Sequence, residues 1–239
     1  MEGIKFFLAI LPVFVFALYV YVHDKEKEPT DLLISSFIFG ILIAIPCIYV
    51  EGALTNVFSF LQKTYITSFI YIFLTVALVE EGYKFLASYI VYYPNKNVNY
   101  TFDMIVYTAF LGLGFSFFEN IVYLKSISLS SIILRAFTAV PVHLSCGIIM
   151  GYYLSQMKTN KKETWKITLK AIFIPVLVHT FYNYYLVYIT NIFKRLFDTN
   201  KAIIVTYSLL VLILGCLFLI VHYVLYKSSV EDKKIKVTK

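Results

Sequence analysis

Charged residues are scarce in this sequence. The 21 basic and 14 acidic residues make up only 15% of the 239-residue chain, whereas about 25% is usual in soluble domains. Hydrophobic residues reach 60%, against a usual share of about 45–50%. A soluble domain with this composition lacks the polar surface to cover itself, and the aromatic content of 18% excludes a disordered chain. The composition therefore predicts a membrane protein that crosses the bilayer several times.

Cysteine is scarce as well. Cys47, Cys146 and Cys216 all lie inside apolar runs and show no CxxC spacing, which excludes a disulfide framework and a zinc ribbon. The sequence also lacks internal repeats, low-complexity tracts and a separate soluble region. We therefore expect residues 1–239 to form a single integral membrane domain.

Long apolar runs are what the sequence has in abundance. A transmembrane α-helix needs about 20 predominantly apolar residues, and seven runs are near or above that length: Ile4–Val22, Leu32–Val50, Ile66–Tyr92, Met104–Leu124, Ser131–Leu154, Ala171–Ile192 and Ala202–Tyr226. Residues Glu51–Lys63 carry apolar side chains at helical spacing, so they form either an interfacial helix or an eighth short span. The sequence thus predicts an all-α transmembrane helix bundle of seven, or eight, spans.

The basic residues indicate how these spans are oriented. With seven spans, thirteen Lys residues lie on one side and seven Lys or Arg residues on the other, and Lys84 within a span completes the 21. The positive-inside rule then predicts an N-terminus outside and a C-terminus in the cytoplasm. Because topology accounts for the net charge of +7, we expect no nucleic-acid partner.

A few ionisable residues lie within the apolar runs, where each charge costs about 2.5–3.5 kcal/mol and usually serves a function. These residues are Glu80, Glu81, Lys84, Glu119, His143 and His179. At 1.5 Å per residue, four of them (Glu80, Glu119, His143 and His179) lie roughly 18–24 Å from the proposed cytoplasmic ends of their spans. Because these four residues lie at one depth, we predict that they form a single polar site.

Local spacing adds detail to this site. Lys84 follows Glu80 by four residues and Glu81 by three, so it can neutralise one carboxylate and leave the other free. Asn183 follows His179 by four residues and projects from the same helix face. The simpler structural alternatives are a buried ion pair at Lys84 and histidines that only pack.

Other polar positions have a structural interpretation. Gly112 and Gly114 precede Glu119 by one to two turns, which allows a close helix approach. Asp103 and Glu51 lie at span edges, where we expect them to be solvated.

Carboxylates, imidazoles and an amide in a wet cavity suit the activation of water. A buried carboxylate can serve as a general base, while two His and one Glu are a ligand set of catalytic zinc. Asn183 could stabilise an oxyanion. No HExxH motif is present, so a metal would need ligands from separate helices. Mid-membrane Glu and His also build proton relays, and a proton-coupled transporter is the alternative function.

Four segments resemble the motifs of the PrsW family of intramembrane proteases. Residues 80–84 read EEGYK and resemble its EExxK motif, and residues 115–120, FSFFEN, resemble its second motif. His143 and residues 179–183, HTFYN, resemble the remaining two. The CAAX prenyl proteases are similar in design but carry EExxxR and FxxxH patterns, from which this sequence departs at Lys84 and Glu119.

The resemblance implies a CAAX-protease-like core over about residues 66–192 and a peptidase in the cytoplasmic membrane of a prokaryote. It implies site-1 cleavage of a single-span substrate such as an anti-sigma factor. By analogy, Glu80 is the expected base, with Glu81 held by Lys84. Glu119, His143 and His179 would bind a divalent metal such as zinc or orient the water, and Asn183 would stabilise the oxyanion. A metal-free glutamate mechanism remains the alternative to the metalloprotease.

Overall fold

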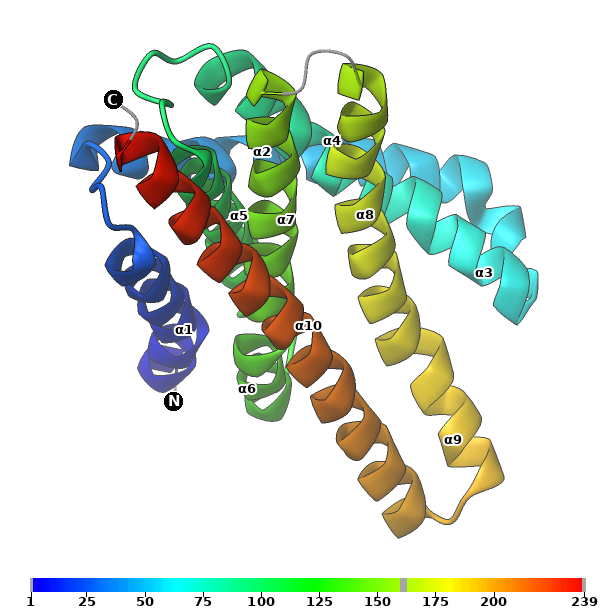
Figure 1. Ribbon diagram of the computed structural model, residues 1–239. Coiled ribbons are helices and arrows are strands. Elements are labelled where there is room, and N and C mark those ends of the chain that lie inside the picture. The colour runs from blue at the N-terminus through cyan, green and yellow to red at the C-terminus, as the bar shows by residue number, and fades with distance from the viewer. Residues whose placement is uncertain (1, 160–162, 238–239) are drawn as a thin grey trace.

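The computed structural model describes residues 2–159 and 163–237, and every regular element in these two ranges is helical. Seven helical stretches in them are long and apolar enough to cross a membrane. These stretches are Glu2–His23, Thr30–Lys63, Tyr65–Tyr92, Thr101–Tyr123, Leu129–Lys158, Thr164–Leu196 and Thr199–Val230. The predicted all-α, polytopic fold is therefore confirmed (Figure 1).

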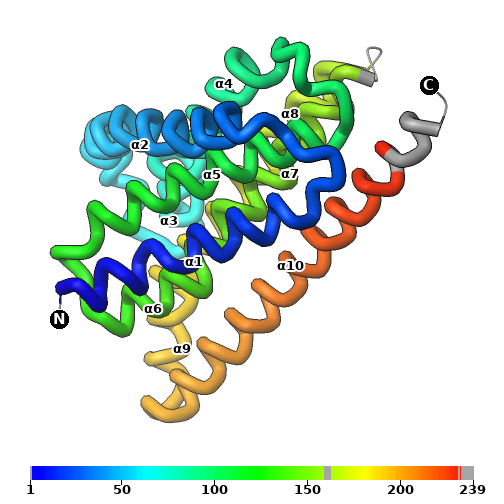
Figure 2. Tube along the Cα trace, turned by 90° about the vertical axis from the view of Figure 1, so that its left-hand side faces the viewer, coloured from blue at the N-terminus to red at the C-terminus, as the bar shows by residue number. Residues whose placement is uncertain are grey.

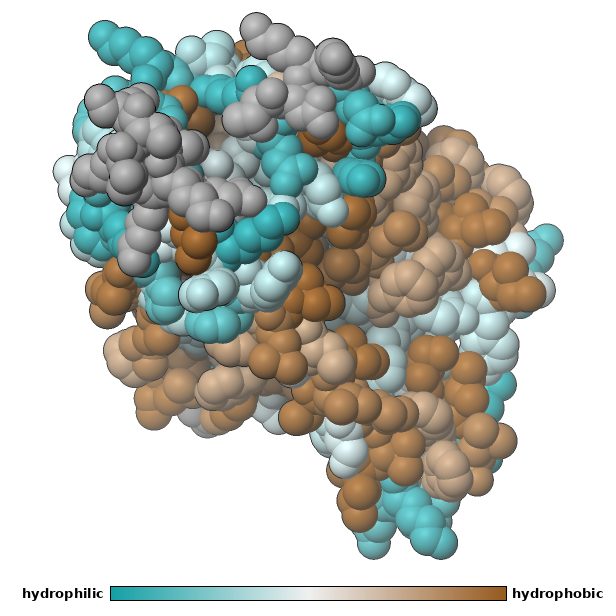
Figure 3. Space-filling model, viewed as in Figure 1, coloured by the Kyte–Doolittle hydropathy of each residue, from teal (hydrophilic) through white to brown (hydrophobic). Residues whose placement is uncertain are grey.

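The α-helices that make up these stretches are α1 Glu2–His23, α2 Thr30–Phe58, α3 Tyr65–Ile72, α4 Leu78–Ala87, α5 Thr101–Tyr123, α6 Leu129–Phe137, α7 Ala139–Thr159, α8 Thr164–Tyr184, α9 Thr190–Leu196 and α10 Thr199–Val237. Figure 2 shows α1 starting at the left of the molecule, whereas α10 rises from the lower part toward the upper right. Figure 3 shows hydrophobic side chains over the lower and right-hand surface, while polar ones gather at the upper left and at the tip formed by the connection between α9 and α10.

Helix α5 lies at the centre of the bundle and packs mainly against α7 and α2. Glycines allow these close crossings. A Cβ added at Gly112 would lie 2.8 Å from the carbonyl oxygen of His143 on α7. A Cβ added at Gly114 would clash with the carbonyl of Phe37 on α2. The close approach predicted for this glycine pair is thus confirmed, and it sets His143 directly against α5.

We expect Gly147→Ala to destabilise the bundle. Gly147 lies on α7, and a Cβ there would lie 2.5 Å from the backbone oxygen of Thr108 on α5. Since backbone cannot move aside as a side chain can, the overpacking should cost about 1–3 kcal/mol. The thermal unfolding midpoint of the purified protein measures this loss. Gly215→Ala is the matched control, because nothing lies within 4 Å of its added Cβ, and an equal loss there would contradict the packing explanation.

The third span is not a regular α-helix. Two π-helical segments, Phe73–Ala77 and Ser88–Tyr92, flank α4. A π-helical insertion shifts the register of the side chains that follow it and is frequent at functional sites. In Figure 1, α2 and the third span cross behind α7 and α8 at a steep angle. The short helix α4 carries Glu80, Glu81 and Lys84.

One predicted boundary was wrong. Glu51–Lys63 is neither a separate interfacial helix nor an eighth span in the described part of the chain, because α2 runs on to Phe58 and a 3₁₀-helix follows it. Tyr71 on α3 donates a hydrogen bond of 3.2 Å to Thr55, which attaches this end of α2 to the third span. The predicted fifth span lies within the single stretch Leu129–Lys158, in which Thr138 separates α6 from α7.

The expectation that Asp103 is solvated was also wrong. Asp103 is fully buried, and its carboxylate accepts hydrogen bonds from the backbone N–H groups of Asn99 and Tyr100 at 2.8 and 2.7 Å. Asp232 on α10 accepts from the N–H groups of Thr101 and Phe102, both at 2.9 Å. These carboxylates satisfy the free amides at the start of α5, so here an acidic side chain at a span edge caps a helix.

Candidate active site

Four ionisable side chains converge inside the bundle. Glu80 and Glu81 come from α4, His143 from α7 and His179 from α8, and one ligand atom from each lies within 4.8 Å of the others. All four side chains are buried. We call these four residues the Glu/His group. Three of the residues that the sequence places at one depth, Glu80, His143 and His179, thus lie together with Glu81 between three helices.

Lys84 lies at the centre of this group and is 1% exposed. Its Nζ is 2.8 Å from Glu81 Oε1, 3.3 Å from Glu80 Oε2 and 2.9 Å from His143 Nδ1. The sequence predicts that Lys84 neutralises one carboxylate, whereas in the structure it contacts both. The shorter distance still pairs it more closely with Glu81.

Glu81 is also held by His179, whose Nδ1 lies 3.0 Å from Glu81 Oε1. The second oxygen, Oε2, is buried and has no hydrogen-bond partner among the described residues. A buried carboxylate oxygen is normally paired. Glu81 therefore keeps one acceptor site available for a cation or a water molecule.

Glu119 lies beside the Glu/His group rather than in it. Its Oε2 is 2.8 Å from His143 Nε2 and 2.9 Å from Arg135 Nη2. Because an ionised carboxylate can only accept, this contact assigns the proton to Nε2 of a neutral His143. The other ring nitrogen, Nδ1, then presents its lone pair to Lys84. The predicted ligand set of Glu119, His143 and His179 is thus not gathered around one point, since Glu119 lies on the far side of the imidazole.

Arg135 is a site residue that the sequence prediction missed. Besides Glu119, it contacts Asn120, donating from Nε to the side-chain oxygen at 3.0 Å, and Asn120 donates in turn to the backbone oxygen of Ala9 at 3.0 Å. In the count of basic residues that predicts the orientation, Arg135 is one of the seven on the outer side. It does lie within the apolar run that contains His143, so the criterion of a charge inside a span would have found it.

A cavity of about 660 Å³ opens over this site. Of the Glu/His group, Glu80 lines it, together with Glu119, Arg135 and Asn183 from the neighbouring helices. Glu51 on α2 lines it as well, although its position at a span edge predicts a solvated residue. Glu80 is therefore the member of the group that faces space large enough for water and a peptide segment.

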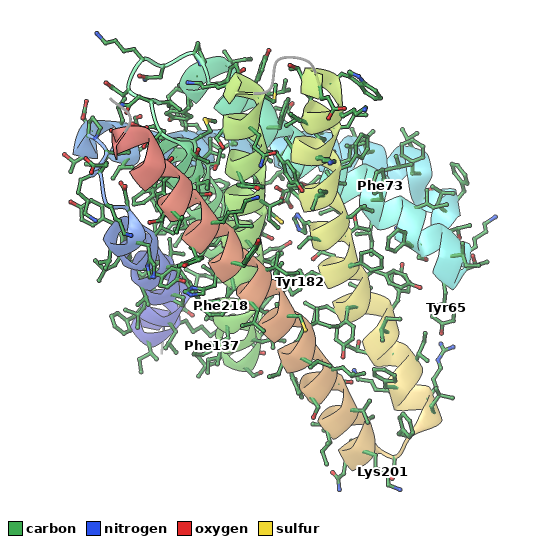
Figure 4. The ribbon with its side chains drawn as sticks, in the orientation of Figure 1. Tyr65, Phe73, Phe137, Tyr182, Lys201 and Phe218 are labelled. Atoms are coloured by element: carbon green, nitrogen blue, oxygen red, sulfur yellow. The ribbon has the colours of Figure 1, made fainter. Side chains whose placement is uncertain are left out.

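A hydrogen bond links the break between α6 and α7 to α8. Tyr182 lies between α7 and α8 (Figure 4), and its hydroxyl is 2.8 Å from the hydroxyl of Thr138. Asn183, the next residue on α8, lines the cavity. This contact attaches the part of α8 that carries Asn183 to the residue just before α7.

The Glu/His group is able to bind a metal ion. Carboxylate oxygens and imidazole nitrogens are donors that zinc accepts from proteins, and all four converge from buried positions. The unpaired Oε2 of Glu81 is consistent with a missing electropositive partner. The donor set and this orphaned oxygen fit a divalent cation.

Known proteins with similar sequences were found across most of the chain. The sequence model of one family, described as PrsW family intramembrane metalloprotease, matches residues 28–222. Protease PrsW of Oceanobacillus iheyensis is 36% identical over 177 residues, which cover 74% of this chain and 80% of the relative. The Protease PrsW of Clostridioides difficile is 32% identical over 190 residues, with 76% and 78% covered. That of Bacillus subtilis is 29% identical over 185 residues, with 76% and 82% covered. No solved structure matches the chain significantly.

Proposed function

Because the chain belongs to the PrsW family of intramembrane metalloproteases, we propose that it makes the site-1 cut in an anti-sigma factor. The substrate is a single-span membrane protein, and its cleavage outside the cytoplasm leads to release of a sigma factor. The observation that carries the proposal is the convergence of Glu80, Glu81, His143 and His179 under a cavity. The rival function, proton-coupled transport, uses the same buried groups, but the family membership favours the peptidase.

Glu80 is the general base in this proposal. Its carboxylate lines the cavity, where it can take a proton from a water molecule that attacks the peptide carbonyl. Glu81 is held by Lys84 and His179 at 2.8 and 3.0 Å, so its role is to fix these two side chains. This division of roles is supported by the position of Glu80 at the cavity wall.

Asn183 acts on the peptide, whereas His143 is a side chain that Glu119 holds in place. Asn183 lines the same cavity as Glu80, and its amide donates to the oxyanion of the tetrahedral intermediate. Such a donor is worth about 3–4 kcal/mol when well placed. Glu119, itself paired with Arg135 at 2.9 Å, holds the Nε2–H of His143 and thereby orients the ring.

A divalent metal ion would be held by the Glu/His group, with zinc the expected ion. When bound, such an ion lowers the pKa of a coordinated water to about 7. The metal-free glutamate mechanism is favoured by one specific observation. Lys84 Nζ already lies within 3.3 Å of three of the four donors, so its ammonium supplies positive charge where a cation would stand. Metal analysis of the purified protein, with chelator inhibition of cleavage, decides between them. One bound ion per chain and inhibition support the metalloprotease.

We place the chain in the cytoplasmic membrane of a prokaryote, with the N-terminus outside, the C-terminus in the cytoplasm and residues 66–192 as the catalytic core. The asymmetry of thirteen basic residues against seven supports this orientation. Figure 4 shows Lys201 at the connection between α9 and α10, which this orientation assigns to the outer surface.

Substitution of the two site histidines tests the function. We expect His143→Ala and His179→Ala each to abolish cleavage of a co-expressed single-span substrate, because each removes a member of the Glu/His group. His222→Ala is the matched control, since His222 lies on α10 away from the site and contacts Tyr19 at 3.4 Å. Full cleavage by both site variants would contradict the proposed mechanism.

A further inference from the structure

A second cavity adjoins the first on the side of α9. It has a volume of about 460 Å³, and Gln62 and Tyr188 line both cavities. Its walls come from the 3₁₀-helix after α2, the start of α3, and α9 with the turn before it. The two cavities therefore adjoin at these residues, and we call them together the path to Glu80, which lines the inner cavity.

The outer cavity is basic, in contrast to the inner one. Lys63, Lys194 and Arg195 line it, no Asp or Glu residue is among its lining residues, and all three basic side chains are exposed. We call these three residues the basic mouth. Arg195 Nη1 donates to the hydroxyl of Tyr65 at 3.2 Å, which links α9 to the first residue of α3. In the inner cavity the lining residues include the carboxylates Glu51, Glu80 and Glu119.

The path also offers partners for a polypeptide backbone. Gln62 and Asn191 line the outer cavity and carry amide groups that can pair with peptide N–H and C=O groups. The hydroxyl of Ser68, another lining residue, is fully buried and has no hydrogen-bond partner within the described ranges. An acyl chain would leave the hydroxyl of Ser68 and the amide of Gln62 unpaired, whereas an extended peptide can satisfy them.

We propose that the basic mouth recognises an acidic segment of the substrate and guides the neighbouring peptide bond to Glu80. The inference rests on the proposed function and names the substrate class. The substrate is a single-span protein with acidic residues just outside the membrane, within a few residues of the bond that is cut. The carboxylates of that segment pair with Lys63, Lys194 and Arg195, while the uncharged residues that follow enter the inner cavity.

Peptide binding tests this proposal independently of cleavage. The probes are fluorescent peptides of one length with glutamates, glutamines or lysines at the same positions, and the full chain carries Glu80→Gln in phosphatidylcholine nanodiscs. We expect the acidic peptide to bind about tenfold more tightly than the glutamine peptide, since three exposed charge pairs together supply about that factor. The combined Lys63→Gln, Lys194→Gln and Arg195→Gln variant should lose this preference. Lys125→Gln, an exposed lysine on the same predicted side that lines neither cavity, should keep it.

The outcomes separate this inference from the proposed function. The inference would be overturned, and the peptidase function would stand, if the rate of cleavage of single-span proteins did not depend on the charge of the substrate. The same holds if that rate did not change when the basic mouth is substituted. Binding of the acidic peptide through the basic mouth, without cleavage by the unsubstituted chain, would support the inference and contradict the peptidase. If the triple variant and the Lys125→Gln variant lost the preference for the acidic peptide equally, the effect would be one of net charge alone, and the inference would be overturned. The inference would also be overturned if peptide binding changed with added phosphatidylglycerol but not with the charge of the peptide, since the basic mouth would then hold lipid headgroups.

Discussion

Glu80→Gln is expected to lower the rate of substrate cleavage by about 10²–10⁴-fold, the range of a lost general base. The substitution keeps the size of the side chain and its place on the cavity wall, but an amide cannot accept the proton of the attacking water. The thermal unfolding midpoint should change little, because Lys84 keeps its closer partner Glu81 at 2.8 Å. The measurement is the rate of product formation by purified protein in liposomes.

The matched control is Glu51→Gln. Glu51 lines the same cavity but belongs to α2 and is not part of the Glu/His group, so its variant should keep most of the activity. If Glu51→Gln were inactive and Glu80→Gln active, the roles assigned to these two carboxylates would be wrong.

Lys84→Met is expected to reduce stability by about 3–5 kcal/mol when metal is chelated, the usual cost of breaking a buried ion pair from one side. Methionine is unbranched like lysine and only one atom shorter, so the change removes the charge with little change in volume. It leaves Glu80 and Glu81, which are 4% and 0% exposed, without their shared cation. Thermal unfolding of the purified protein measures the loss, and cleavage should disappear with it.

Lys166→Met provides the comparison for Lys84→Met. Lys166 pairs with Glu163 at 2.7 Å with the same sequence separation as Lys84 and Glu81, but both side chains are about half exposed. Solvent screens an exposed pair, so this substitution should leave the unfolding midpoint unchanged. An equally small effect of Lys84→Met would show that the buried lysine does not neutralise the two glutamates.

The position of the site along the chain could be predicted from the sequence because helices have a fixed rise per residue. That rule places Glu80, His143 and His179 at one depth, and the structure brings them together. Depth alone does not fix rotation about the helix axis. Glu119 also lies at that depth, but it contacts the nitrogen of the His143 imidazole that points away from the Glu/His group.

The contributions of Arg135 and Glu51 depend on tertiary structure that the hydrophobic pattern does not encode. The hydrophobic pattern of the fifth span does not show that the helix is interrupted at Thr138. Arg135 lies on α6, before this interruption, and contacts Glu119 at 2.9 Å. The continuation of α2 beyond its apolar run likewise brings Glu51 to the cavity wall. Composition and periodicity predict which helices exist, whereas breaks and extensions depend on packing.

The most direct test of the central claim is cleavage in water enriched in oxygen-18. Purified protein and a single-span test protein are reconstituted in liposomes, and the fragments are analysed by mass spectrometry. If the Glu/His group hydrolyses the peptide bond, a cut appears on the outer side and its new carboxyl group contains oxygen from the solvent. His143→Ala and His179→Ala then give no fragments. Proton flux that depends on these residues, without any fragment from the unsubstituted protein, would contradict the peptidase and support the transporter.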